Sequence, residues 1–117
     1  MDIRELVRCI LAGNLLSARQ WVADANRASM AWDEVGRPEG LTKTEMSVAA
    51  GLVELLAARS GGTPPSWTAK VGALQEPVVL DPGLEKMPRS FARAKKEAPE
   101  PLRRRNLVAL PDFLDVA

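Results

Sequence analysis

The distribution of proline divides this 117-residue chain into two parts that differ in local structure. Residues 1–62 contain a single proline, whereas six of the nine prolines lie between Pro77 and Pro111. Proline lacks a backbone N–H and restricts the preceding residue to extended conformations, so closely spaced prolines exclude long helices. The sequence therefore predicts a helical core over residues 1–62 and short helices joined by extended segments over residues 63–117.

Two amphipathic helices are expected at the start of the chain, because apolar side chains recur there at intervals of three and four residues. The first spans about residues 3–11 and begins at Asp2. Gly13-Asn14 ends it, because both residues tolerate a left-handed backbone. The second helix begins after Asn14 and either ends near Arg27 or continues through Trp32. The two form either an angled pair or one kinked helix.

The clearest local signal marks a third helix over residues 42–59. Thr42 and Glu45 have the spacing of a capping box, in which the two side chains satisfy backbone N–H groups at a helix start. The small residues Ala49-Ala50-Gly51 in its middle allow a neighbouring helix to approach closely. A second copy of the chain is one expected neighbour, which would make a homodimer.

The second part of the chain is too apolar for a disordered tail, so we expect it to pack on the N-terminal helices or on a partner. Its predicted elements are one or two helical turns at 66–73, an extended segment at 78–80, a short helix around 88–97, a strand or extended arm at 107–110 and a last helical turn from Pro111. The predicted fold class is mainly α, with one structural domain overall.

The residue types that the sequence lacks exclude several kinds of site. The chain has no histidine, no tyrosine and one cysteine. Histidine-dependent catalytic pairs, histidine-ligated zinc sites and intrachain disulfides are therefore excluded. The adjacent carboxylates of Asp33 and Glu34 point apart on a helix and suit a solvated helix end. We expect a non-enzymatic protein with no cofactor, no metal site and no membrane span, located in the cytoplasm.

Charge is concentrated near the end of the chain, although the net charge is only +1. Residues 1–85 carry 8 basic and 11 acidic side chains, whereas residues 86–105 carry 8 basic and 2 acidic ones, a net charge of +6. A short helix in this band places Arg89, Arg93 and Lys96 on one face. That face is a solvated basic face, a surface that attracts an acidic protein, or a surface that binds nucleic acid phosphates.

Arginine and aromatic side chains of residues 64–67 and 86–114 are the candidates for a partner-binding surface. Arginine suits interfaces because its planar guanidinium pairs with carboxylates through two hydrogen bonds and stacks on aromatic rings. For the tryptophans, packing in the core is the alternative. The expected contact residues are Trp67, Arg89, Arg93, Arg103, Arg104, Arg105 and Phe113.

A series of short motifs between residues 45 and 117 resembles a group of small bacterial proteins. In order they are P-P-x-W-T from Pro64, M-P-R from Met87, P-L-R-R-R from Pro101 and P-x-F-L from Pro111. Members of this group are often encoded beside AbiEii-type nucleotidyltransferase toxins. The resemblance implies that the chain is an antitoxin-like or regulatory partner that neutralises such a toxin by direct binding. The group has no assigned catalytic residues, and none is transferred to this chain.

The implied mechanism is electrostatic. A nucleotidyltransferase-like toxin needs acidic metal-binding residues in its cleft, and the arginine triplet Arg103–Arg105 could occupy such a cleft. The alternative function is a regulator that binds nucleic acid through the basic band at residues 86–105. No helix-turn-helix signature precedes this band, and aromatic residues are almost absent from it. A helix that reads a nucleic acid sequence is therefore not expected here.

Overall fold

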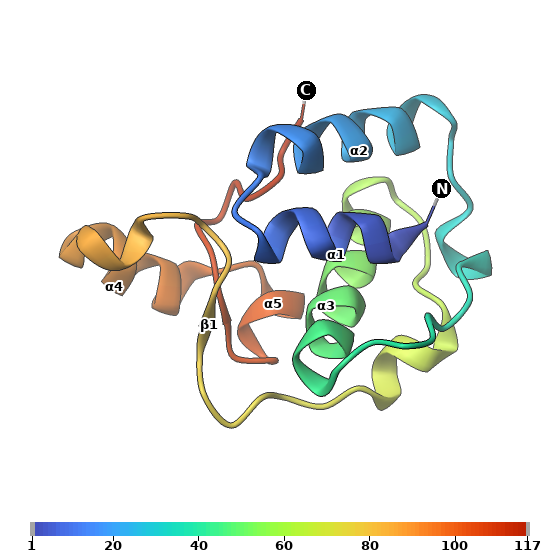
Figure 1. Cartoon of the computed structure of the whole chain (residues 1–117). Coiled ribbons are helices and arrows are strands. Elements are labelled where there is room, and N and C mark those ends of the chain that lie inside the picture. Colours follow the sequence, from blue (N-terminus) through green and yellow to red (C-terminus); the bar gives the residue numbers. More distant parts are fainter. Residues whose placement is uncertain (1, 117) are drawn as a thin grey trace.

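A computed structural model describes residues 2–116, so Met1 and Ala117, which begin and end the two expected parts, lie outside the described residues. The predicted mainly α fold class is confirmed (Figure 1). Within residues 2–116 the α-helices are α1 (Ile3–Leu11), α2 (Leu15–Arg27), α3 (Lys43–Arg59), α4 (Pro88–Glu97) and α5 (Glu100–Arg103). The 3-10 helices are η1 (Trp32–Glu34), η2 (Ser66–Lys70) and η3 (Leu84–Lys86), and the strands are β1 (Val78–Val79) and β2 (Leu107–Val108).

The first two helices form an antiparallel pair rather than one kinked helix (Figure 1). Gly13 adopts the expected left-handed conformation after α1, with φ of 76°. The backbone N–H of Asn14 donates to the carbonyl of Cys9 at 2.9 Å, which closes the helix end. The second helix ends at Arg27, so its continuation through Trp32 does not occur.

Helix α3 is the centre of the molecule and crosses α1 (Figure 1). The predicted capping box is confirmed, because the Thr42 side chain accepts from the Glu45 N–H and the Glu45 side chain accepts from the Thr42 N–H. Every residue from Ser47 to Ala57 is buried. A helix that is apolar on all sides must be covered on all sides, and α1, α5, η1 and η2 supply this cover.

The small residues of α3 admit a neighbouring helix, as predicted, but this helix belongs to the same chain. A Cβ atom added at Gly51 would lie 3.0 Å from the Leu102 side chain and 3.1 Å from the Leu107 side chain. Both residues come from the second part of the chain, at α5 and β2. This face of α3 is therefore covered and is not free to pack on a second copy.

The second part of the chain packs on the helices. Its extended segments at residues 78–80 and 107–110 contain β1 and β2, which pair in parallel with Val78 opposite Leu107. Neither this pairing nor α5 was predicted. Where a last helical turn was expected from Pro111, residues 111–114 form hydrogen-bonded turns that are not part of a helix, and Leu114 adopts a left-handed conformation with φ of 56°, which cannot continue a helix.

Helix α4 projects from the helical body (Figure 1). A small apolar cluster separate from the main core anchors it. The buried members of this cluster are Leu84, Ala94 and Val108, and Val79, Phe91 and Leu110 pack against them. The inward face of α4 is therefore satisfied by its own chain, and its outward face is left to solvent.

Candidate interaction surface

The arginine triplet is divided between the interior and the surface. Arg105 is only 2% exposed, whereas the Arg104 side chain is 46% exposed. The Arg103 side chain is exposed and turns towards α4, where its Nη1 donates to the carbonyl of Lys96 at 3.1 Å. Three chemically identical side chains therefore have three different environments.

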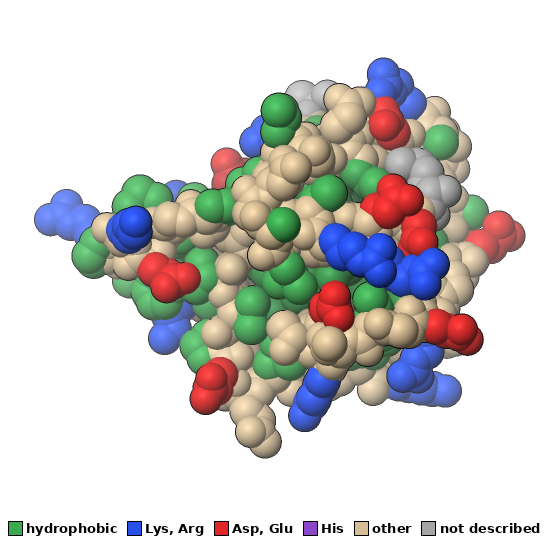
Figure 2. Space-filling model, viewed as in Figure 1, with side chains coloured by type: hydrophobic (Ala, Val, Ile, Leu, Met, Phe, Trp, Pro, Cys, Tyr) green, Lys and Arg blue, Asp and Glu red, His purple; other side chains and the backbone are tan. Residues whose placement is uncertain are grey.

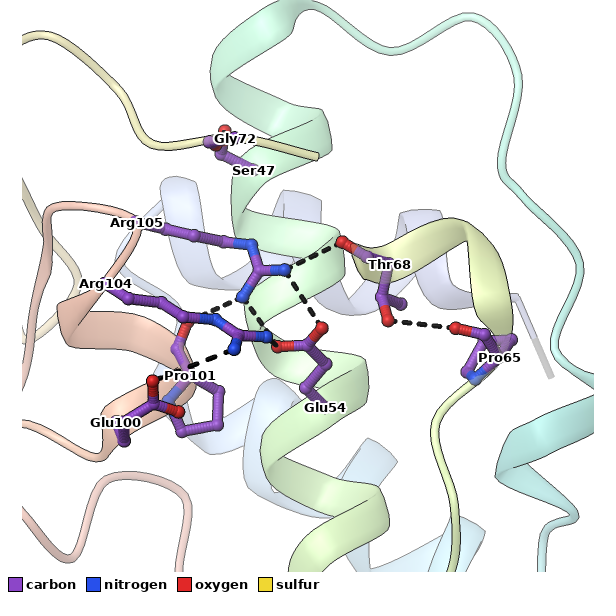
Figure 3. Close-up of polar contacts among 9 residues, drawn as sticks. All are labelled: Ser47, Glu54, Pro65, Thr68, Gly72, Glu100, Pro101, Arg104 and Arg105. Carbon is purple, nitrogen blue, oxygen red and sulfur yellow. Dashed lines mark hydrogen bonds and ion pairs between the residues drawn. The ribbon is translucent and has the colours of Figure 1, made fainter. Parts of the chain in front are cut away.

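Arg105 forms a bidentate ion pair with Glu54 on α3 (Figure 3). Its Nη1 lies 2.7 Å from Glu54 Oε1 and its Nη2 lies 3.0 Å from Oε2. The same two nitrogens donate to the carbonyls of Pro101 at 2.9 Å and Thr68 at 2.8 Å. Arg105 thus joins α3, η2 and α5 from the inside. Its expected role in partner contact is incompatible with this burial.

Glu54 is the acidic partner of two of the three arginines, Arg104 and Arg105. Burial opposes its ionisation, but hydrogen bonds and charge from Arg105 and the charge of Arg104 outweigh it, and the pKa of Glu54 is lowered. Arg104 also pairs with Glu54, and its Nη1 lies 3.7 Å from Glu100 Oε1. Our sequence interpretation missed Glu54. The signal was one carboxylate within the apolar run of α3, because a buried carboxylate requires a cation.

Trp67 and Phe113 also hold the fold together. The Trp67 indole N–H donates to the carbonyl of Val35 at 2.8 Å, and the ring packs against the main core. Phe113 is 3% exposed, and its carbonyl accepts from Arg59 Nη1 at 2.5 Å. The half-buried Trp67 therefore anchors the start of the second part, and the buried Phe113 offers no surface to a partner. This placement of Phe113 corrects its expected role.

Three of the expected contact residues, Arg89, Arg93 and Arg103, lie on the projecting helix or beside it, whereas Arg104 pairs with Glu54. We define the basic surface as the exposed cations Arg89, Arg93, Lys95, Lys96 and Arg103. Helix α4 places Arg89, Arg93 and Lys96 on one face, as predicted. Figure 2 shows basic side chains around the projecting lobe. Arg93 Nε forms an exposed ion pair with Glu97 at 2.9 Å. Glu97 thus offsets one of the five positive charges of the basic surface.

An exposed apolar side chain borders the basic surface. Met87 is 49% exposed and comes immediately before Pro88, the first residue of α4. Protein interfaces combine apolar contact, often from methionine, with arginine. The start of α4 therefore combines an exposed apolar side chain with exposed cations.

Within residues 2–116, no group of three or more Cys, Asp or Glu side chains is placed to hold a metal ion, and no helix is long and apolar enough to cross a membrane. No family model matches the chain, and no curated protein or solved structure matches it either. Toxin binding, implied by the resemblance above, therefore stays a prediction.

Proposed function

We propose that this chain is a non-enzymatic binding protein and that the basic surface of α4 contacts an acidic surface on a partner protein. The observation that carries the proposal is the difference between the two faces of α4. Its inward residues are held by their own apolar cluster, while its outward cations outnumber nearby acids. Such a helix can meet a partner without unfolding any part of the body.

The partner implied by the resemblance is a nucleotidyltransferase-like toxin, which the chain would neutralise by direct binding. The carboxylates that hold metal in the cleft of such an enzyme give it the charge complementary to the basic surface. Among the triplet, Arg103 is the side chain available for this contact, because Arg105 is committed to Glu54.

Nucleic acid binding is the second candidate, and the same exposed cations support it. Neither Phe91 nor Trp67 presents a free ring for stacking on bases, because both are half-buried and pack against apolar clusters of their own chain. Salt should weaken binding in both cases, and the two candidates differ in how steeply it does so. Binding to duplex DNA should weaken steeply with salt, with a slope that scales with the number of neutralised phosphates.

The test is co-expression of the chain with the proposed nucleotidyltransferase-like toxin, followed by size-exclusion chromatography and a growth assay. The wild-type chain should co-elute with the toxin and restore growth. A variant with Arg89, Arg93, Lys96 and Arg103 changed to alanine should do neither. The matched control changes four exposed cations elsewhere to alanine: Arg8, Arg37, Lys43 and Lys70. Full neutralisation by the first variant would contradict the proposal.

A further inference from the structure

Helix α4 and the short helix η3 that precedes it form an arm, which we define as residues 84–97. The arm projects from the body formed by α1, α2 and α3 (Figure 1). The elements that α4 contacts most are η3, α5 and β2, all of which belong to the second part of the chain. The arm is therefore held chiefly by the second part and only indirectly by the three long helices.

The apolar cluster that anchors the arm is small. Its buried members are Leu84, Ala94 and Val108, and Ala94 is the one buried residue among the ten of α4. In the main core, by contrast, α3 alone buries every residue from Ser47 to Ala57. Because burial of apolar surface is the main source of stability, the arm is held much less strongly than α3.

Helix α4 also lacks the local features that would keep it folded without this cluster. Isolated helices shorter than about 12–15 residues are marginal in water, and α4 has ten residues. Its N-cap residue, Met87, makes no side-chain hydrogen bond to the helix start. Arg89 lies in the first turn, where the helix carries partial positive charge, and stands four residues from Arg93, so like charges repel along one face.

The backbone at both ends of the arm separates it from its neighbours. Gly83 precedes η3 in a left-handed conformation with φ of 76°, and an added Cβ atom there would meet nothing within 4 Å. After α4, Ala98 and Pro99 are extended, with ψ of 148° and 139°. Helix α5 begins only after this break, so loss of helix in the arm need not spread into α5.

We infer that the arm opens as one cooperative unit while the rest of the chain stays folded. Opening separates Leu84 and Ala94 from Val108 and breaks the helical hydrogen bonds of α4. The pairing of β1 with β2 persists, because Val78 and Leu107 pack in the main core. Only the closed arm presents the cations of α4 on one face. Opening thus regulates the basic surface; this regulatory role rests on the proposed function, whereas the opening itself does not.

Native-state hydrogen exchange of the full chain, followed by NMR at rising urea concentrations below the unfolding transition, tests the inference. The hydrogen-bonded amides of α4 should share one level of protection, about 100-fold lower than that of α3. Their protection should also fall less steeply with urea, because opening the arm exposes little surface. Equal protection and equal urea dependence in α3 and α4 would overturn the inference. So would a gradient of protection along α4, which indicates fraying from one end.

Two substitutions in separate apolar clusters distinguish the arm from the body. Ile10→Val, in the main core, should lower the protection of α3 and leave that of α4 unchanged, because the contacts of Ile10 persist when the arm opens. Leu84→Ala should remove most of the protection of α4 while the amides of α3 stay protected, because the body folds without the arm.

Either of two results with these variants would contradict an independent arm. One is a loss of protection in α4 caused by Ile10→Val, and the other is a loss of protection throughout the chain caused by Leu84→Ala. These measurements contain no partner protein. The inference can therefore fail while the proposed contact with an acidic partner stands, and the contact can fail while the arm still opens.

Discussion

At the scale of single residues, the direction in which a side chain leaves the backbone decides whether it is buried or exposed. Arg103, Arg104 and Arg105 follow one another at the end of a helical turn, so their side chains leave the backbone in different directions. One direction meets Glu54 in the interior and another meets α4. The charge run was visible in the sequence. Its division was not, because it depends on a carboxylate fifty-one residues away.

The triplet predicts a graded loss of stability on substitution by alanine. Arg105→Ala should lower the free energy of unfolding by about 3–5 kcal/mol, because it leaves the buried Glu54 carboxylate without its bidentate partner. Arg103→Ala should change it by no more than about 0.5 kcal/mol, since this side chain is exposed. Urea denaturation followed by circular dichroism measures both. Similar losses for the two variants would contradict the assignment of Arg105 to the interior.

Glu54 predicts a pH dependence of stability. Its pKa is lower in the folded protein than its ordinary value of 4.5. Its contribution is therefore fully present above pH 4.5 and is lost as the pH falls through the folded pKa. Glu54→Gln should be less stable than the wild type at neutral pH and should lose less further stability on acidification. Denaturation midpoints at neutral pH and below pH 4.5 test this. A parallel decline of both proteins would contradict it.

At the scale of elements, local signals predicted what local interactions determine. The capping box of α3 and the glycine after α1 were identified correctly because each acts within a few residues. The pairing of β1 with β2 and the existence of α5 were missed. Both depend on contacts between distant segments, and a four-residue helix has too few residues to show a period.

The close contact between α3 and α5 predicts that Gly51 tolerates no side chain. Gly51→Ala should lower the free energy of unfolding by about 1–3 kcal/mol, although alanine is the better helix former, because the new methyl group meets Leu102 and Leu107. Gly36→Ala is the control, since an added Cβ there meets nothing within 4 Å. Thermal unfolding distinguishes them, and an unchanged or raised midpoint for Gly51→Ala would contradict the packing described.

The end of α2 predicts a stabilising substitution. Ser29 occupies the left-handed position that glycine fills after α1 and α3, so Ser29→Gly should raise the free energy of unfolding by about 0.5–1 kcal/mol. Ser60→Gly provides the opposite control, because Ser60 has φ of −93° and its hydroxyl donates to the carbonyl of Leu56 at 2.9 Å. Chemical denaturation of both variants should give changes of opposite sign. A loss of stability in Ser29→Gly would argue against strain at that residue.

At the scale of the whole molecule, the chain is a covered central helix with one projecting arm. The basic band of the sequence predicted the basic surface, because four of its five residues lie on the single helix α4. A pocket at the ends of α2 and α3 had no counterpart in the sequence. Its walls come from three separate segments, residues 22–33, 56–63 and 114–116, which only the fold brings together. The apolar second part was expected on the helices or on a partner, and in this structure it covers the helices.

The affinity of the full chain for a nucleotidyltransferase-like toxin, the partner proposed above, measured by calorimetry at two salt concentrations, tests the central claim most directly. The wild type should bind more weakly at the higher salt concentration. Alanine at Arg89, Arg93, Lys96 and Arg103 should weaken binding about 100-fold and reduce this salt dependence, if each contact contributes about 0.7 kcal/mol. The four-cation control should bind like the wild type. Affinity unchanged by removal of the basic surface would contradict the claim that α4 carries the contact.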